Sequence, residues 1–309
     1  MSKIAALVFV IVGFTAACKK DQSATGADSK KAMGLYAQGF NALLDDPSRL
    51  IAGYFSAMPT GEPPDGRGPG LSDASFATSK LKDARTSFAA ANEAAPESLK
   101  LGPAAEAAIT SAEAAVALYE TAYKYYQAES FKDDKGAKGK QLHAQLTAAS
   151  TTFDAAMSTL GASMETIEDA QMTDEVAKYA GDKGYGYWFR FYTQQAKHVV
   201  LQVTRAHSAA DLAKAVTAIK ALAPHDQGLA GFVSSKGPKL SSTFKNYVDR
   251  ASAFQAETAK LVRLIEAGKT LEDNDVSHAA DSVIGAFNGL IQMGNALYQV
   301  EAVDNLKDE

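Results

Sequence analysis

The chain of 309 residues contains one cysteine, Cys18, and this scarcity excludes two kinds of chemistry. No disulfide can form within the chain, which suits an exported protein that needs none. A cysteine nucleophile in the body of the protein is excluded, because no cysteine follows position 18. A chain of this length buries about three quarters of its unfolded surface, so its core requires neither disulfides nor a metal.

Motifs that indicate a metal or phosphate site are also missing. None of the five histidines lies three or four residues from another, so no helical pair of metal-ligating histidines is present. The acidic runs at 133–134 and 272–275 lack the ligand pattern of a calcium-binding loop. Neither a Gly-x-Ser-x-Gly elbow nor a phosphate-binding glycine loop occurs. We therefore expect no metal and no cofactor.

Basic charge is not concentrated in any part of the chain. The sequence has 31 Lys and Arg residues against 36 Asp and Glu residues, for a net charge of −5. Proteins that bind nucleic acids carry a concentrated basic face, because binding depends on neutralising phosphates. We expect no nucleic-acid partner.

Residues 1–18 resemble the leader of a bacterial lipoprotein. Lys3 provides a basic start, the apolar run 4–14 is too short for a permanent membrane span, and small residues at 15–17 precede Cys18. Thr15 stands where this motif usually has a leucine. We expect residues 1–17 to be a signal peptide and Cys18 to be lipidated. The alternative is an ordinary secreted protein with an incidental thiol.

The residues after Cys18 bear on where the protein is anchored. Lys19 occupies the position at which lipoproteins retained in the inner membrane typically have an aspartate. We expect a lipid anchor in the bacterial cell envelope, at the periplasmic face of the outer membrane if the organism has two membranes. The small and polar residues at 18–31 predict a flexible tether between the membrane and the folded part.

The remainder of the chain predicts helices. Apolar residues repeat at alternating spacings of three and four in 105–126, 142–167, 240–265 and 276–297, and no alternating strand pattern occurs. Two such stripes joined by a short charged turn predict an antiparallel helical hairpin. We expect an all-α fold, an elongated bundle of about seven to eight helices built from such hairpins. It forms a single domain over 32–303, with an acidic tail at 304–309.

Prolines and glycines mark the expected breaks. Asp46-Pro47 predicts a kinked or restarted helix, and four prolines and four glycines within 59–70 predict a loop. A helical segment over 174–205 should break near 181–186, where glycines cluster. A capping box at 208–211 predicts a helix that ends at Pro224.

The stretch 119–153 contains the most distinctive sequence motifs in the chain. It contains Tyr125-Tyr126, Phe131-Lys132-Asp133-Asp134, Lys138-Gly139-Lys140 and Leu142-His143. This series resembles the YiiG-like bacterial lipoproteins, a family built on a domain of unknown function, although Phe131 stands where the family has a tyrosine. Pro-Thr-Gly at 59–61 fits the same layout. The resemblance implies an envelope lipoprotein with a helical domain, and it transfers no catalytic residue.

Two groups of side chains are candidate sites. Acidic residues at the turn can cap the following helix, and lysines near a helix start need acidic or anionic partners. The turn is thus either a recognition site or a solvated structural turn. The aromatic group at 185–192 is either core packing or a ligand-binding patch. The candidates are Tyr125, Tyr126, Asp133, Asp134, Lys140 and His143 in the turn, and Tyr187, Trp188 and Tyr192 in the patch.

We expect a non-enzymatic, lipid-anchored helical module that binds an envelope protein or polymer, or stabilises an assembly. Two alternatives remain open. One is an envelope enzyme that acts on wall polymers through carboxylates converging from different helices, which two facing carboxylates of raised pKa would favour. The other is a small-ligand carrier, which an apolar pocket lined by Trp188 and Tyr192 would favour.

Overall fold

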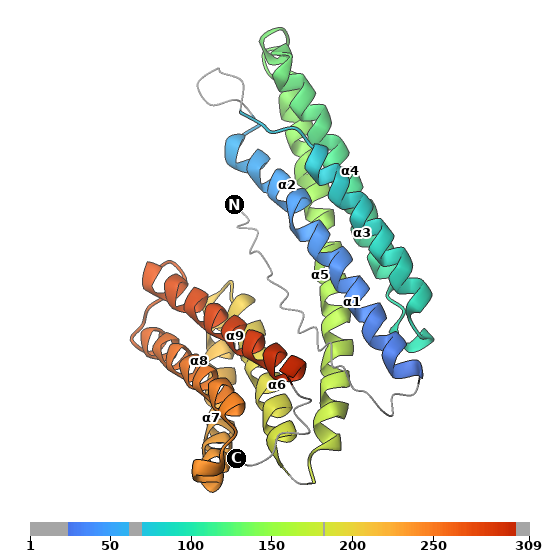
Figure 1. The fold of residues 1–309 in the computed structure, drawn as a ribbon. Helices are drawn as coiled ribbons and strands as arrows, with labels where there is room; N and C mark the ends of the chain where they lie inside the picture. Colours follow the sequence, from blue (N-terminus) through green and yellow to red (C-terminus); the bar gives the residue numbers. More distant parts are fainter. Residues whose placement is uncertain (1–23, 62–69, 182, 301–309) are drawn as a thin grey trace. The chain divides into compact units, whose positions relative to one another are not determined.

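The computed structural model describes residues 24–61, 70–181 and 183–300. The expected signal peptide, Cys18 and the acidic tail at 304–309 lie outside the described residues. The described part contains no strand, so the predicted all-α fold is confirmed. Its helices are α1 (Ala24–Leu44), α2 (Asp46–Ala57), α3 (Ser75–Ala94), α4 (Gly102–Gln127), α5 (Ala137–Lys178), α6 (Tyr185–Thr204), α7 (Ala209–Lys236), α8 (Ser242–Glu266) and α9 (Asn274–Val300) (Figure 1).

Helices α1 and α2 are separated by Asp45 alone, and Pro47 lies in the first turn of α2. Proline is favourable there because the amide hydrogen that it lacks has no helical partner at that position. The pair therefore forms one bent helix, as the Asp-Pro sequence predicts. Counted in this way, the described residues contain eight helices.

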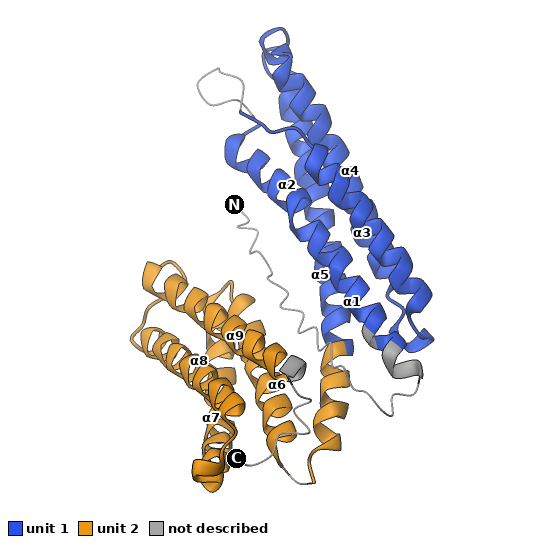
Figure 2. Ribbon diagram, viewed as in Figure 1, with its two compact units in different colours: residues 1–9, 22–167 blue, residues 10–21, 168–309 orange. Residues whose placement is uncertain are grey.

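The described helices group into two compact units (Figure 2). Unit 1 contains α1 to α4 and the part of α5 that ends at Ile167, and unit 2 begins at Glu168 and contains the rest of α5 with α6 to α9. The boundary falls inside one continuous helix. The single domain over 32–303 stays a prediction.

In unit 1, α1 packs along α3, and α3 packs against α4. Gly39 permits a close approach of the first two, because a β-carbon at this position would lie 2.5 Å from the ring of Phe88. The fully buried Tyr36 hydroxyl accepts a hydrogen bond from the backbone N–H of Leu101 at 2.9 Å. Its own proton goes to the side-chain oxygen of Asn92. The core of unit 1 thus satisfies a buried hydroxyl with neutral partners.

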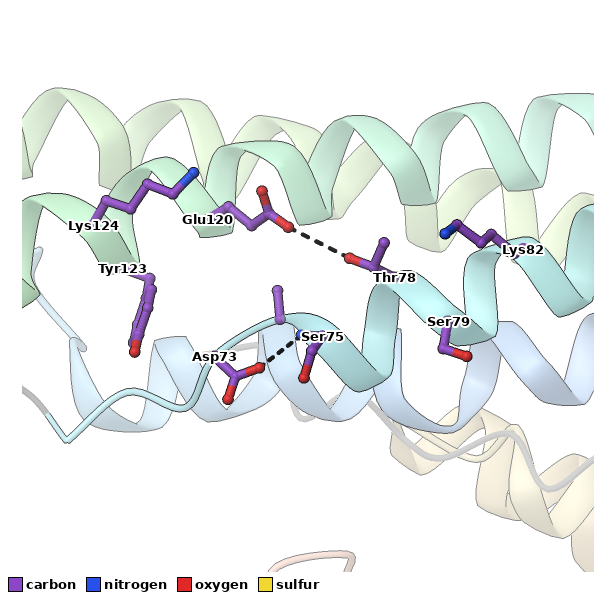
Figure 3. Close-up of a pocket in the computed structure, with 9 residues that line it drawn as sticks. Asp73, Ser75, Thr78, Ser79, Lys82, Glu120, Tyr123 and Lys124 are labelled. Carbon is purple, nitrogen blue, oxygen red and sulfur yellow. Dashed lines mark hydrogen bonds between the residues drawn. The ribbon is translucent and has the colours of Figure 1, made fainter.

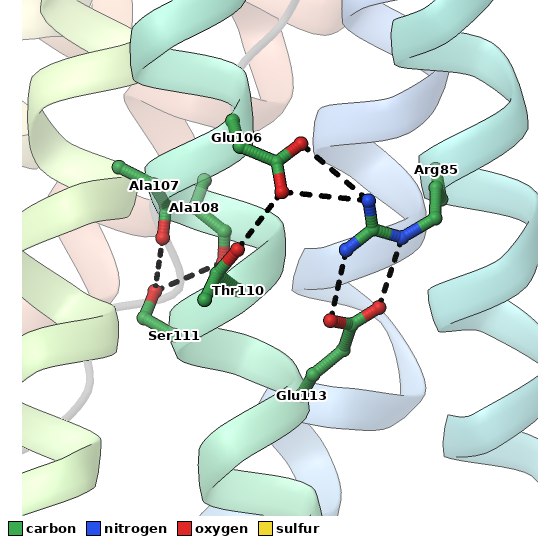
Figure 4. Close-up of polar contacts among 7 residues, drawn as sticks. All are labelled: Arg85, Glu106, Ala107, Ala108, Thr110, Ser111 and Glu113. Atoms are coloured by element: carbon green, nitrogen blue, oxygen red, sulfur yellow. Dashed lines mark hydrogen bonds and ion pairs between the residues drawn. The ribbon is translucent and has the colours of Figure 1, made fainter.

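On the outer face of α3 and α4, Arg85 joins two glutamates (Figure 4). Its guanidinium makes two bonds to Glu113, at 3.1 and 2.9 Å, and approaches Glu106 at 3.4 Å. The side chains of Arg85, Glu106 and Glu113 are 48%, 62% and 41% exposed. Solvent screens such pairs strongly, so this cluster contributes at most about 1 kcal/mol.

In unit 2, α8 packs against α9, and α6 packs against α7 and α9. The stripes predicted at 240–265 and 276–297 provide the buried faces of α8 and α9. Tyr247 is fully buried, donates to the carbonyl of Phe189 at 3.2 Å and lies 2.9 Å from the Thr193 hydroxyl. The buried residues of the two stripes are Phe244, Tyr247, Ala251, Phe254, Thr258 and Leu261 in α8, and Val276, Val283, Phe287, Leu290 and Leu297 in α9.

Three local predictions were wrong. Helix α1 already begins at Ala24 and so covers the end of the expected tether at 18–31, because alanine and lysine favour continuation of a helix. Helix α7 continues through Pro224, since Leu222 and Leu229 on either side are both buried and their packing offsets the lost backbone bond. The first residues of the expected segment 174–205 belong to α5, although the break near 181–186 is confirmed.

Candidate functional site

The turn between α4 and α5 is held by Asp134. The Tyr125 hydroxyl at the end of α4 donates to Asp134 Oδ1 at 2.6 Å. The backbone N–H of Gly136 donates to the same oxygen at 2.9 Å, and that of Lys138 donates to Oδ2 at 3.1 Å. Asp134 therefore caps the start of α5, as predicted, and also ties it to α4.

These bonds change the acidity of both side chains. The hydrogen bond from Tyr125 stabilises the ionised carboxylate and lowers the pKa of Asp134. Burial, together with the bond to Asp134, raises the pKa of Tyr125 to about 12. At neutral pH the pair consists of a neutral hydroxyl donor and an ionised acceptor.

Tyr126 connects the turn to the end of α2. Its buried hydroxyl donates to the carbonyl of Gly61 at 3.0 Å, and its ring lies edge-on to Tyr125 with centroids 4.9 Å apart. A β-carbon at Gly139 would collide with the Tyr126 hydroxyl. The glycine of the Lys-Gly-Lys motif therefore allows the first turn of α5 to pack against the tyrosine pair.

His143 is a packing residue. Its ring lies 5.8 Å from that of Tyr54 and 5.6 Å from that of Phe55. Gly61, with φ +76°, passes so close that a β-carbon there would lie 2.7 Å from the β-carbon of His143. Burial lowers the pKa of His143, which favours the neutral ring at pH 7.

Asp133 and Lys140 are the members of the predicted turn site that point outward. Both are exposed, as is Lys135, whose backbone is left-handed with φ 54°. Lys132 forms a 2.5 Å ion pair with Glu129 beside them. The structure therefore divides the six predicted residues: Tyr125, Tyr126, Asp134 and His143 build the turn, and Asp133 and Lys140 are presented by it.

The three residues of the predicted aromatic patch make different contacts. Tyr187 stacks on Phe191 with centroids 5.2 Å apart. The Trp188 ring lies over Gly228 of α7, where a β-carbon would collide with it. Tyr192 is fully buried, and its hydroxyl donates to Asp226 Oδ1 at 2.9 Å. Trp188 and Tyr192 thus serve helix packing within unit 2.

Sequence reasoning missed the polar face of α6. Arg190 is 1% exposed, although it is charged. Its Nε lies 3.6 Å from Glu175 Oε2, and its guanidinium carbon lies 4.0 Å from the ring centroid of Tyr179. One terminal nitrogen donates to the carbonyl of Gly186 at 3.1 Å, and the other to the Tyr179 hydroxyl at 3.3 Å. The buried cation thus lies against a carboxylate, a carbonyl, a hydroxyl and an aromatic ring.

One helical turn further along α6, the contacts are hydrogen bonds to the end of α5. Gln194 donates to the Thr173 hydroxyl at 2.8 Å and to Asp169 Oδ1 at 3.3 Å. His198 Nε2 lies 2.6 Å from the same oxygen. Burial disfavours the ionised form of Asp169, but the bonds from His198 and Gln194 outweigh it and hold its pKa below the usual value.

The last contact of this group is an ion pair between Lys197 and Glu168. Lys197 Nζ lies 2.5 Å from Glu168 Oε2, and the two side chains are only 10% and 12% exposed. We call the residues 168–179, which are the end of α5 and Tyr179, the strap, and their contacts with α6 the seam. The signal in the sequence was the spacing of Arg190, Gln194 and Lys197 by four and three, which places polar residues on one face of an apolar helix.

Open grooves lie elsewhere among the described residues. One, of about 480 Å³ between α3 and α4, is lined by Asp73, Lys82, Tyr123 and Lys124, and is crossed by a 3.4 Å bond from Thr78 to Glu120 (Figure 3). Another, of about 550 Å³ between α6 and α7, is lined by His198, Gln202, Ala210, Ala213, Lys214, Thr217, Ala218 and Ala221.

Among the described residues, two carboxyl groups have a pKa raised by burial. They are Asp154 in unit 1 and Asp226 in unit 2. In the described ranges, no three His, Cys, Asp or Glu side chains are grouped so that they could hold a metal ion. None of the helices in those ranges combines the length and the apolar content of a membrane span.

Comparison with known proteins places this architecture in a family. A family model with the description "Protein of unknown function (DUF3829)" matches residues 29–290. The chain belongs to this family. The DUF3829 match spans residues of both units, including the turn and the seam. No curated protein and no solved structure matches the chain.

Proposed function

We propose that this DUF3829 protein is a lipid-anchored, non-enzymatic component of the bacterial cell envelope that binds an envelope protein or polymer through the turn between α4 and α5. The basic start, the short apolar run and Cys18 support the anchor. The motifs shared with YiiG-like lipoproteins support the same location. In a bacterium with two membranes, Lys19 favours the periplasmic face of the outer membrane.

The observation that supports the binding role is that some residues of the turn hold its backbone while others are exposed at its surface. Hydrogen bonds at Asp134 and Tyr126 hold its backbone, whereas Asp133, Lys135 and Lys140 are exposed at its surface. Binding residues are commonly carried on loops that a rigid scaffold positions. A preorganised turn loses little conformational entropy when a partner binds. The exposed charges of both signs give this preorganised turn groups that can pair with a charged partner.

The anchor is tested by replacing Cys18. We expect the wild-type protein to incorporate radiolabelled palmitate and to sediment with membranes, because acyl chains bury apolar area in the bilayer. The Cys18→Ala variant should lose the label and move to the soluble fraction. A Cys18→Ala protein that remains acylated would refute the anchor without affecting the proposed binding role.

The binding role is tested by photo-crosslinking in cells. A photoreactive amino acid at Asp133 should trap a discrete product, and the same group at the exposed Asn246 of α8 provides the control. Charge reversal by Lys140→Glu should abolish the product while the variant stays folded, as circular dichroism measures. Equal products from both positions, or a product insensitive to Lys140→Glu, would contradict the proposal.

A further inference from the structure

We propose that the strap is a releasable element of unit 2, which docks on α6 through its charges and opens while α6 to α9 stay folded. The first argument is the composition of the apolar core. The cluster of buried apolar side chains in unit 2 is formed by residues from Tyr185 to Leu297, and among the described residues none of its members comes from the strap. Met172 is the one buried apolar side chain of the strap. The core of unit 2 is thus complete without it.

The second argument is the chemistry of the seam. Its contacts are ion pairs and hydrogen bonds, including the pairs of Arg190 with Glu175 and of Lys197 with Glu168. The desolvation of buried charges offsets most of their attraction, whereas their geometry specifies one register. After release, water solvates the same groups. The seam therefore positions the strap accurately, and release of the strap leaves none of these charges buried without a solvating partner.

The third argument is the connection that follows the strap. The described residues 179–181 and 183–184 belong to neither α5 nor α6, and Lys183 has left-handed backbone with φ 47°. Gly181 and Gly184 lie in the same connection, and glycine adopts most backbone conformations without steric cost. Hinges are short segments of this kind, in which a few residues absorb the dihedral change. The strap can therefore move without displacing the start of α6.

Release has a defined consequence for the charge of unit 2. The strap carries Glu168, Asp169 and Glu175, which face Arg190, Lys197 and His198 of α6. Opening would uncover the positive charges of Arg190 and Lys197 on α6.

Hydrogen exchange measured by mass spectrometry on the full-length protein tests this proposal. A helix end without tertiary packing frays, so each release of the strap exposes its amides to exchange. We expect amides at 170–178 to exchange at least about tenfold faster than those at 145–160 of the same helix and those of α8 and α9. If the strap amides exchange as slowly as those of α8 and α9, the proposal is wrong. This comparison uses the wild-type protein, so it does not depend on the folding of any variant.

Variants of the ion pair then test the role of charge. Glu168→Gln should accelerate exchange at 170–178 at least about tenfold, because Lys197 keeps its charge and loses its partner. Exchange in α8 and α9 should stay unchanged. The matched control is Glu113→Gln, which removes a carboxylate from the exposed pair with Arg85 and should alter neither region. Acceleration throughout unit 2 by Glu168→Gln would overturn the proposal, since the strap would then belong to the cooperative core.

Reversal of the pair gives the final check. The double variant Glu168→Lys with Lys197→Glu should restore slow exchange at 170–178 relative to Glu168→Gln. Failure of the reversed pair to restore protection would show that shape, and not charge, holds the strap.

Discussion

The two ends of α5 are fastened by different chemistry. At its start, glycines and tyrosines bring backbones into contact, and the carboxylate of Asp134 accepts hydrogen bonds from a hydroxyl and two amides. At its end, long charged side chains bridge to α6, with Arg190 and Lys197 nearly excluded from water. The first arrangement depends on shape, because no space remains for another carbon atom. The second depends on charge, because a buried ion cannot be left without its partner.

The chain connections explain part of this difference. The turn at the start of α5 is short and hydrogen-bonded, so α4 and α5 must approach each other there. Small residues are then needed at the contact. At the other end, α5 ends at Lys178 and α6 begins at Tyr185. Arginine and lysine have long apolar stems, so their charged ends can reach a partner on another helix. Mutations should therefore affect the two ends differently.

The largest change in the free energy of unfolding is expected at the seam. Arg190→Ala should lower the free energy of unfolding by about 3–5 kcal/mol, because it leaves acceptors without their buried cation and creates a cavity. Urea unfolding monitored by circular dichroism measures the change. The matched control is Arg85→Ala at the exposed cluster of unit 1, for which we expect a loss within about 1 kcal/mol. Equal losses at the two arginines would show that burial of Arg190 has no energetic consequence.

The next largest change in the free energy of unfolding is expected at the start of α5. Gly139→Ala should cost about 1–3 kcal/mol, because the added methyl group collides with the Tyr126 hydroxyl. Gly231→Ala in α7 is the control, since no atom lies within 4 Å of a β-carbon built there. It should be neutral or stabilising, as alanine favours helix more than glycine. Tyr126→Phe should recover part of the loss in the Gly139→Ala background, and additive effects would contradict the proposed collision.

A smaller effect is the dependence of stability on pH at both ends. The pKa values of Asp134 and Asp169 are both lowered in the folded state. An acid with a lowered pKa stabilises the fold fully above its unfolded value, about 3.9, and the contribution is lost as pH falls through the folded value. Asp134→Asn and Asp169→Asn should each flatten the decrease of the thermal midpoint below about pH 4. If the variant curves run parallel to the wild-type curve, these carboxylates do not contribute to acid unfolding.

The smallest effect is expected at the exposed residues of the turn. Asp133→Lys should leave the midpoint of urea unfolding unchanged, because its side chain is exposed and Asp134 alone caps α5. Tyr125→Phe, which removes the hydroxyl bond to Asp134, should lower that midpoint. A larger loss for Asp133→Lys than for Tyr125→Phe would reverse the assignment of structural and presented residues.

The periodicity of the sequence predicted most of the fold, because a stripe of apolar residues requires a buried face wherever it docks. It placed the hairpin of α4 and α5, the buried faces of α8 and α9, and the break before α6. The expectation that a proline ends a helix failed where tertiary packing stabilises the helix on both sides of the proline. Pro224 is tolerated because Leu222 and Leu229 are both buried in α7. The seam was missed because its partners, such as Glu168 and Lys197, lie in different helices.

The sequence by itself determined the all-α class and the position of the turn, because both follow from local spacing and from the preferences of glycine, proline and aspartate. It also carries the leader pattern on which the proposed anchor depends. Only the tertiary structure decided which residues of the turn are internal and which are exposed, since that depends on the approach of Gly61 and Tyr126 to α5. It alone paired the charges of the strap with those of α6, because contacts between residues about 30 positions apart are set by packing and not by local preference.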